Sequence, residues 1–284
     1  MGKIAVITDT DSSLPPALAA QFGILQVPVT IHFDDSSYTT GVDIDDRILF
    51  EKIDRFNKLP TTSAPAPSAF ADAFTAAFND GAEGVVCICV SSKVSATYHA
   101  ALTACENFPG RDITVIDSLT LSMSQGFMAL EAAEAVRKGA VKAEIIETVH
   151  QMGDRLHLYA ALATLKYLAL SGRVGKLVAG IADTFNVKPI LTVQEGKLDL
   201  LERIRTHKKA LERMLELTCA SVGAKTIARA AVIHVNNLEG AKELEDRLRA
   251  VLPCPEEIIT AEFTPGLSVH AGSGVVGVVV LTNP

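Results

Sequence analysis

Two short stretches of the sequence concentrate hydroxyl side chains in a way that suits the binding of an anion. Thr61-Thr62-Ser63 lies between prolines, and residues 91–97 (SSKVSAT) join a predicted strand to a predicted helix. Hydroxyl groups and the free N–H groups at the start of a helix both donate hydrogen bonds to negative groups. Helix capping explains Ser91 or Ser92 alone more simply, because serine is a preferred capping residue. Capping does not require so many hydroxyls, and the excess points toward an anion site.

The sequence lacks the common motifs of nucleotide binding and of nucleophilic or metal catalysis. Residues 272–277 (GSGVVG) fit the spacing G-x-G-x-x-G, but three valines follow where a dinucleotide fold needs a helix. A glycine turn before a strand is the better interpretation. Residues 172–176 (GRVGK) have the wrong spacing for a P-loop, and Leu177 stands where Ser or Thr should follow. No G-x-S-x-G, S-x-x-K or H-E-x-x-H motif occurs, and no Cys/His cluster indicates a metal.

Two further residues have local surroundings that allow a functional role. His270 lies in residues 264–273, a stretch with glycine and proline that we expect to be a loop, and solvation explains it as well as function does. Arg173 lies between glycines, where exposed surface charge is the simpler explanation. The remaining histidines have no spacing that links them, and we expect structural or surface roles for His32, His99, His150, His157, His207 and His234.

An alternation of strands and helices in the first half must position the hydroxyl stretches. Strands are expected at residues 4–7, 26–33, 85–90 and 113–116, and helices at 17–22, 43–57, 69–79, 95–107, 123–138 and 142–152. This alternation predicts a parallel α/β sheet, whose ligands bind at the carboxyl ends of the strands. Three polar loops are expected there, at residues 8–13, 91–97 and 117–124.

The second half has a different pattern. Strands are expected at residues 156–163, 188–193, 230–234, 257–261 and 274–281, and helices at 166–170, 175–185, 207–220 and 240–251. The strand at 188–193 ends in the turn Glu195-Gly196. We expect two domains: residues 1–155 with a Rossmann-like parallel sheet, and residues 156–284 with an α/β fold and a mixed or antiparallel sheet.

The composition is that of a soluble folded protein and argues against nucleic-acid binding. Of 284 residues, 48% are apolar and 21% charged, and the net charge of −7 comes without a long Lys/Arg run. Five scattered cysteines argue against a disulfide framework, and Cys87 and Cys89 should share one face of a strand as small apolar groups. With neither a signal peptide nor an apolar run of spanning length, we expect a cytoplasmic protein without stable membrane insertion.

Several segments, taken in order, resemble the motifs of the bacterial DegV family of fatty-acid-binding proteins over residues 4–281. The matching segments are VITDTDSSLP at 6–15, TSAP at 62–65, SSKVSATY at 91–98, Asp117-Ser118, LSGR at 170–173, KPIL at 188–191 with GKL at 196–198, and HAGSG at 270–274. Each segment is short, but their order and spacing together are specific.

The resemblance implies a two-domain α/β fold with a long-chain fatty acid in a buried tunnel between the domains. It implies that Thr62 and Ser95 hold the carboxylate, with the head group also near Ser92, Thr97 and His270. It further implies that a separate fatty acid kinase phosphorylates the bound acid with ATP, which connects the chain to phospholipid metabolism. Arg173 matches a position near the exposed head group, facing that partner. The chain itself would have no catalytic residue, metal or cofactor.

Two positions depart from the family pattern. Ala96 replaces a glycine, and Ser273 replaces a proline. A Cβ atom at position 96 would oppose a backbone with positive φ, or would narrow the approach to the carboxylate.

A carrier is physically reasonable because the alkyl tail alone can supply affinity. Burying one methylene gains about 0.8 kcal/mol, so about 15 methylenes gain on the order of 12 kcal/mol as an upper bound. Hydroxyls then have only to offset the desolvation of the carboxylate. Phosphoryl transfer needs a metal and a nucleotide cradle, which we expect a partner to provide. Two alternatives stay open: a stand-alone serine esterase or thioesterase that uses Ser95 or Ser92 with His270, and a regulatory protein that senses lipid.

Overall fold

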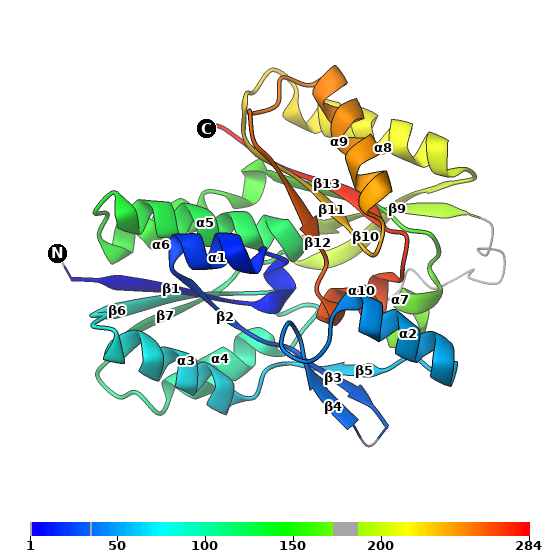
Figure 1. Ribbon diagram of the computed structural model, residues 1–284. Coiled ribbons are helices and arrows are strands. Elements are labelled where there is room, and N and C mark those ends of the chain that lie inside the picture. Colours follow the sequence, from blue (N-terminus) through cyan, green and yellow to red (C-terminus); the bar gives the residue numbers. More distant parts are fainter. Residues whose placement is uncertain (1, 35, 173–186) are drawn as a thin grey trace.

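Figure 1 shows a computed structural model of the chain, which describes residues 2–34, 36–172 and 187–284. The strands form a four-stranded parallel sheet, a three-stranded antiparallel sheet and a six-stranded mixed sheet. The predicted α/β fold class, with a parallel N-terminal sheet and a mixed C-terminal sheet, is therefore confirmed. The division at residue 155 stays a prediction. The helix expected at residues 175–185 and the site residue Arg173 lie outside the described residues.

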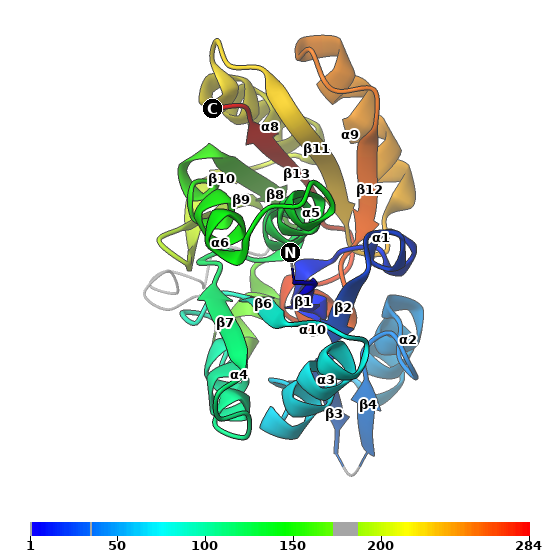
Figure 2. The same ribbon diagram turned by 90° about the vertical axis from the view of Figure 1, so that its left-hand side faces the viewer.

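The parallel sheet has the strand order β2-β1-β6-β7. Its strands are β1 (Ile4–Asp9), β2 (Ile24–Val27), β6 (Gly84–Cys89) and β7 (Asp112–Asp117). One face is covered by α3 (Pro67–Asn79) and α4 (Thr97–Cys105), and the other by α1 (Pro16–Phe22), α5 (Ser122–Arg137) and α6 (Lys142–His150). Figure 2 shows these helices on opposite sides of the sheet. Cys87 and Cys89 are fully buried with their Sγ atoms 3.7 Å apart, so the expected shared face is confirmed.

The six-stranded sheet has the order β10-β9-β8-β13-β11-β12. Its strands are β8 (Leu156–Ala161), β9 (Lys188–Gln194), β10 (Lys197–Ile204), β11 (Ile227–His234), β12 (Ile258–Glu262) and β13 (Val276–Thr282). One face packs against α8 (His207–Val222) and α9 (Leu238–Val251). The other face looks toward the N-terminal half, so side chains of alternating position contribute to two separate apolar clusters.

Helix α5 lies between the parallel sheet and the six-stranded sheet, and nearly all of its residues up to Ala133 are buried. A helix buried in this way has no single apolar stripe, and α5 also buries the polar Ser122, Ser124 and Gln125 near its start. At its far end Arg229 of β11 forms ion pairs with Glu131, at 2.6 Å, and with Glu134. These half-buried pairs connect the two halves of the chain away from the site described below.

The small antiparallel sheet corrects one prediction. Residues 26–33 were expected to form one strand, but the chain breaks at Pro28 into β2, which joins the parallel sheet, and β3 (Thr30–Phe33). Proline lacks an N–H donor and favours this change of sheet. Strand β3 pairs with β4 (Ser36–Thr39) and with β5 (Thr61–Ser63), which is the first of the two hydroxyl-rich stretches.

The remaining helices gather beside this small sheet. They are α2 (Asp46–Phe56), α7 (Lys166–Ser171) and α10 (Pro265–Ala271). Elsewhere in the chain, two short 3-10 turns occur, η1 (Thr10–Ser12) after β1 and η2 (Gly153–Arg155) before β8. Within the described ranges no helix combines the length and apolar character needed to cross a bilayer.

Candidate ligand-binding site

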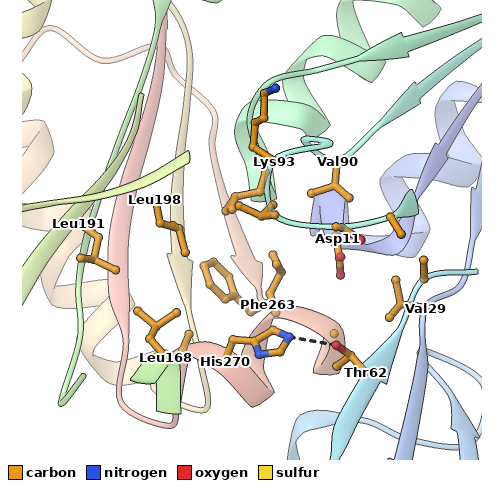
Figure 3. A pocket seen from close by; sticks show the side chains of 18 of the residues that line it. Asp11, Val29, Thr62, Val90, Lys93, Leu168, Leu191, Leu198, Phe263 and His270 are labelled. Carbon is orange, nitrogen blue, oxygen red and sulfur yellow. Dashed lines mark hydrogen bonds between the residues drawn. The ribbon is translucent and has the colours of Figure 1, made fainter. Parts of the chain in front are cut away.

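A cavity of about 670 Å³ lies between the carboxyl ends of the parallel strands and the inner face of the six-stranded sheet (Figure 3). This volume is typical of sites for small organic ligands. Apolar side chains dominate its wall: Val29, Ala64, Val90, Val94, Ala96, Leu121, Leu158, Ala160, Leu162, Leu168, Leu191, Leu198, Phe263, Leu267, Ala271 and Val275. Polar residues join them: Asp11, Thr62, Ser63, Ser92, Lys93, Ser95, His99 and His270.

The exposed members of this lining mark the side on which the cavity opens. They are Ser63, Lys93, Ala96 and His99, all from the N-terminal half. The leucines on the inner sheet face, from β8 and β9, are buried. The cavity therefore has an open end beside the hydroxyl-rich segments and a closed apolar end against the six-stranded sheet.

The loop after β6 is folded by its own hydrogen bonds and presents Ser92 and Ser95 to the cavity. The Ser91 carbonyl accepts hydrogen bonds from the backbone N–H groups of Val94 and Ser95, both at 3.1 Å. The Ser95 hydroxyl lies 2.8 Å from the Thr97 hydroxyl. Thr97 is fully buried and is not part of the lining, so it contacts Ser95 from behind.

Ala96 adopts φ −81°, so the expected conflict between its Cβ and a positive φ does not arise. Its side chain lies on the exposed rim of the cavity. Ser273 lies between Gly272 and Gly274, which both have positive φ, and it is not among the lining residues.

Thr62 and His270 are brought together although they are 208 positions apart in the sequence. Thr62 lies in β5 and its Oγ1 is 3.1 Å from Nε2 of His270 (Figure 3). Which of the two donates depends on the histidine tautomer. Both side chains are half-buried and line the cavity, so either can also meet a ligand.

His270 lies in the last turn of α10, which corrects the prediction of a loop at residues 264–273. Pro265 occupies the first helical turn, where proline is tolerated because its missing N–H would be unpaired anyway. Two side-chain hydrogen bonds hold α10 on the N-terminal half. Thr264 Oγ1 donates to the Thr10 carbonyl at 2.9 Å, and Ser268 Oγ donates to Asp46 Oδ2 at 2.7 Å.

Two buried carboxyl groups beside the site have raised pKa values. Burial raises the pKa of Asp46 to about 7; the Ser268 hydrogen bond opposes this shift, and Glu262 and Asp45 add to it. Burial raises the pKa of Asp9 to about 6. That group accepts hydrogen bonds from the N–H groups of Val90, at 2.8 Å, and Asp11, at 2.9 Å, and from Gln125 Nε2, at 3.0 Å. These bonds fix the ends of β1 and β6 against α5.

Three lining residues were missed from the sequence. Asp11 belongs to the polar loop expected at residues 8–13 but was not singled out; it lies against α10, where a Cβ added at Gly266 would be 2.4 Å from its Oδ1. His99 was treated as a surface or structural residue; it is exposed but also lines the cavity. Lys93, inside the SSKVSAT motif, lies on the exposed rim of the cavity, as His99 does. The i, i+4 spacing between Ser95 and His99, within a segment expected to be helical, was the one sequence pattern that could have placed His99 near the hydroxyl loop.

Two described hydrogen bonds of the site join His270 and Ser95 to threonine hydroxyls. Among the described hydrogen bonds, Nε2 of His270 meets Thr62, and the Ser95 hydroxyl meets Thr97. The described part of the chain contains no group of three or more His, Cys, Asp or Glu side chains that could hold a metal ion.

Comparison with known proteins relates this cavity to a family. DegV from Bacillus subtilis is 32% identical over 277 residues, which cover 97% of this chain and 98% of the relative. A structure described as fatty acid binding of a DegV family protein, from Thermus thermophilus, has a TM-score of 0.92 at 29% identity and covers 99% of this chain and 100% of its own. The structure of Bacillus subtilis DegV, described as a fatty acid binding protein, has a TM-score of 0.89 at 29% identity and full coverage of both chains.

The family model for uncharacterised proteins of the DegV family matches residues 3–283. That span includes the hydroxyl loops, β5, α10 and the whole six-stranded sheet. The resemblance in the short motifs thus extends to the complete chain and to its fold. On this evidence the chain belongs to the DegV family.

Proposed function

We propose that this chain is a carrier that binds a long-chain fatty acid in the cavity, with the tail on the six-stranded sheet and the carboxylate at the open end. The observation that carries the proposal is the continuity of one cavity from a hydroxyl-rich rim to a wall of buried leucines. Burial of the tail supplies affinity without directional contacts. The relatives described as fatty-acid-binding share the fold over their full lengths, which supports the same ligand class here.

Thr62, Ser95, Ser92 and His270 are the proposed carboxylate-binding residues, with Thr97 holding Ser95 in place. Hydrogen bonds to an ionised carboxylate are stronger than those between neutral groups, and they offset its loss of water. Lys93 and His99 lie on the same rim and add positive or titratable groups near the head group.

A carboxylate at the open end would be accessible to a second protein. We propose that a fatty acid kinase phosphorylates it there, and that Arg173 faces this partner. A carrier that presents its cargo needs no catalytic residue of its own. A stand-alone esterase and a lipid-sensing regulator are the competing functions. The esterase would use Ser92 or Ser95 with His270, whereas the described contact of His270 Nε2 is with Thr62.

The first experiment asks whether the acid binds and where its head group lies. Native mass spectrometry of the gently purified protein should show a bound C16 or C18 acid. Hexadecanoic acid should bind, and its methyl ester should bind more weakly. The variant Thr62→Ala/Ser95→Ala should lose about 10- to 100-fold in affinity for the acid, the effect expected for lost hydrogen bonds to a charged group. Its affinity for the ester should change little.

Thr61→Ala is the matched control, because Thr61 is the exposed neighbour of Thr62 in β5 and is not among the lining residues. A double variant that binds the acid as tightly as this control would refute the head-group assignment. A wild-type protein with no affinity for any C14–C20 acid would refute the carrier.

The second experiment addresses the partner. Affinity capture from a bacterial lysate, followed by incubation with ATP and labelled acid, should yield a kinase and acyl phosphate. Arg173→Ala should reduce phosphorylation more than it reduces acid binding. Capture of a transcription or signalling protein instead, with no acyl phosphate formed, would favour the lipid-sensing alternative. Ester or thioester hydrolysis that Ser95→Ala abolishes would favour the enzyme.

A further inference from the structure

The hairpin of β9 and β10 forms part of the apolar wall across the cavity from Thr62. Leu191 and Leu198 line the cavity from this hairpin, and Figure 3 shows them across the cavity from Thr62, with Phe263 between. Val193 and Leu200 belong to the same apolar cluster, so one face of the hairpin is turned to the cavity. A bound tail would lie against this face.

The hairpin is a unit with a limited attachment to the rest of its sheet. Strands β9 and β10 share seven residue pairs, whereas β9 and β8 share two, Ala160–Leu191 and Ala161–Ile190. Three further bonds reinforce this junction: the Leu162 N–H donates to the Pro189 carbonyl at 2.9 Å, Thr192 Oγ1 donates to the Leu158 carbonyl at 2.8 Å, and Lys188 Nζ donates to the Ala163 carbonyl at 3.1 Å. Since β10 is an edge strand, the hairpin can turn about β8 without breaking any other strand pairing. Near its base it is also held to α8, where Arg213 Nε donates to Glu202 Oε1 at 2.8 Å.

The tip of the hairpin is fastened to the opposite half of the molecule by one serine. Glu195 and Gly196 form a two-residue turn in which both φ angles are positive, as in a type I′ turn. The hydroxyl of Ser91 donates to the Gly196 carbonyl at 2.7 Å. The contact is close, because a Cβ added at Gly196 would come within 2.5 Å of Ser91 Oγ.

The same serine shapes the loop that carries the head-group hydroxyls. Its Oγ accepts a hydrogen bond from the Lys93 N–H at 3.2 Å, and its carbonyl accepts from Val94 and Ser95. Ser91 is completely buried and does not line the cavity, so it is not placed to touch a ligand itself. One side chain therefore connects the tail wall to the head-group loop.

We propose that Ser91 is a positioning residue of this site, which holds the β9–β10 hairpin closed over the ligand tail. Release of the Ser91–Gly196 bond frees the tip, the hairpin turns about β8, and the tail passes in or out. Closure then orders the tail wall and the 91–97 loop together. This inference rests on the proposed function of binding a fatty acid.

The test is the rate of ligand exchange, measured by stopped-flow fluorescence with cis-parinaric acid. Ser91→Ala should raise kon and koff together by about 2- to 10-fold, the factor that one neutral hydrogen bond supplies, while Kd changes less. Gly196→Ala should act in the same direction, because its Cβ would meet Ser91 Oγ and because a side chain is strained at φ +80° in this turn. Ser221→Ala is the matched control: it removes a serine that bonds Tyr159 at 2.6 Å, away from the cavity lining.

Hydrogen exchange of the ligand-free protein separates this inference from the carrier function. In Ser91→Ala the amides of residues 188–204 should exchange faster than in wild type, and those of β11 and β13 should not. Equal exchange in both proteins, or a higher Kd with kon unchanged, would overturn the positioning role. If cis-parinaric acid fails to bind the wild type while the amides respond as expected, the ligand class is wrong but the fastening stands.

Discussion

The two halves of the chain meet on either side of the cavity, and the two contacts are built differently. On one side α10 is joined to the N-terminal half by Thr264, Ser268 and His270. On the other side the described hydrogen bonds give the hairpin tip a single side-chain link, from Ser91. The first side carries Thr62 and His270 of the proposed head-group residues, and the hairpin on the second carries part of the proposed tail wall.

This difference follows from the forces that each side uses. Hydrogen bonds to a carboxylate are directional, so His270 and Thr62 must be held to within a few tenths of an ångström. Burial of an alkyl chain has no preferred direction, so Leu191 and Leu198 can be carried on an element that moves. A carrier must bind tightly and still exchange its cargo, and a fixed polar side with a movable apolar side reconciles the two needs.

The largest expected effect comes from placing a charge in the apolar wall that the β9–β10 hairpin carries. Leu198→Asp should reduce affinity for hexadecanoic acid by more than about 100-fold, because an ionised group facing an alkyl chain loses its water without gaining a partner. Leu198→Asn, of nearly the same shape, should cost about 10-fold through lost apolar contact alone. Isothermal titration would measure both, with thermal melting as the check on folding. Equal losses in the two variants would mean that charge in this wall is solvated and that the tail lies elsewhere.

A second prediction concerns the contact between α10 and the N-terminal half. Ser268→Ala leaves the buried Asp46 without its described donor, and at pH 8 should lower the free energy of unfolding by about 2 kcal/mol. The pKa of Asp46 is about 7 in the folded protein, above its ordinary value of 3.8, so the folded state binds this proton more tightly. The burial penalty of the ionised form is therefore present above pH 7 and is relieved as pH falls through 7.

Chemical denaturation at pH 6 and pH 8 would test this sign. The loss should be smaller at pH 6, and the double variant Ser268→Ala/Asp46→Asn should lose about the same at both pH values. A loss that is equal at both pH values in the single variant would show that Asp46 does not titrate in this range.

The smallest expected effect comes from a substitution in the turn of the β9–β10 hairpin. Glu195 has φ 48°, a conformation that asparagine tolerates better than glutamate. Glu195→Asn should therefore stabilise the turn by on the order of 0.5 kcal/mol. Differential scanning calorimetry should show a slightly higher Tm, and release of bound acid should slow. A lower Tm would mean that the Glu195 side chain makes a favourable contact that outweighs its backbone strain.

The regular elements were predictable because their apolar periodicity is strong and local. The parallel strands and their helices lie near the expected residues, and the polar loops at the strand ends do face the cavity. Helix α10 was missed because Pro265, Gly266 and Gly272 together look like a loop. In the structure the proline starts the helix and Gly272 ends it, while packing on α2 and the Asp46–Ser268 bond hold it in place.

The site could be anticipated only in part. Motifs identified Thr62, Ser95 and His270, but no spacing in the chain predicts that a residue of β5 meets one of α10. The Ser91–Gly196 contact has the same origin, since 105 positions separate its partners. Such contacts depend on how two sheets are placed in space, which local sequence patterns do not encode.

The separate pairing of β9 with β10 also has an evolutionary consequence. Because residues 188–204 keep most of their strand pairing within the hairpin, mutations there can reshape the tail wall without rebuilding either sheet. Preference for chain length or for a double bond could thus drift from lineage to lineage while recognition of the acid group stays constant. Grafting this hairpin between relatives would transfer the preference for particular acyl chains while the carboxylate-binding residues stay unchanged.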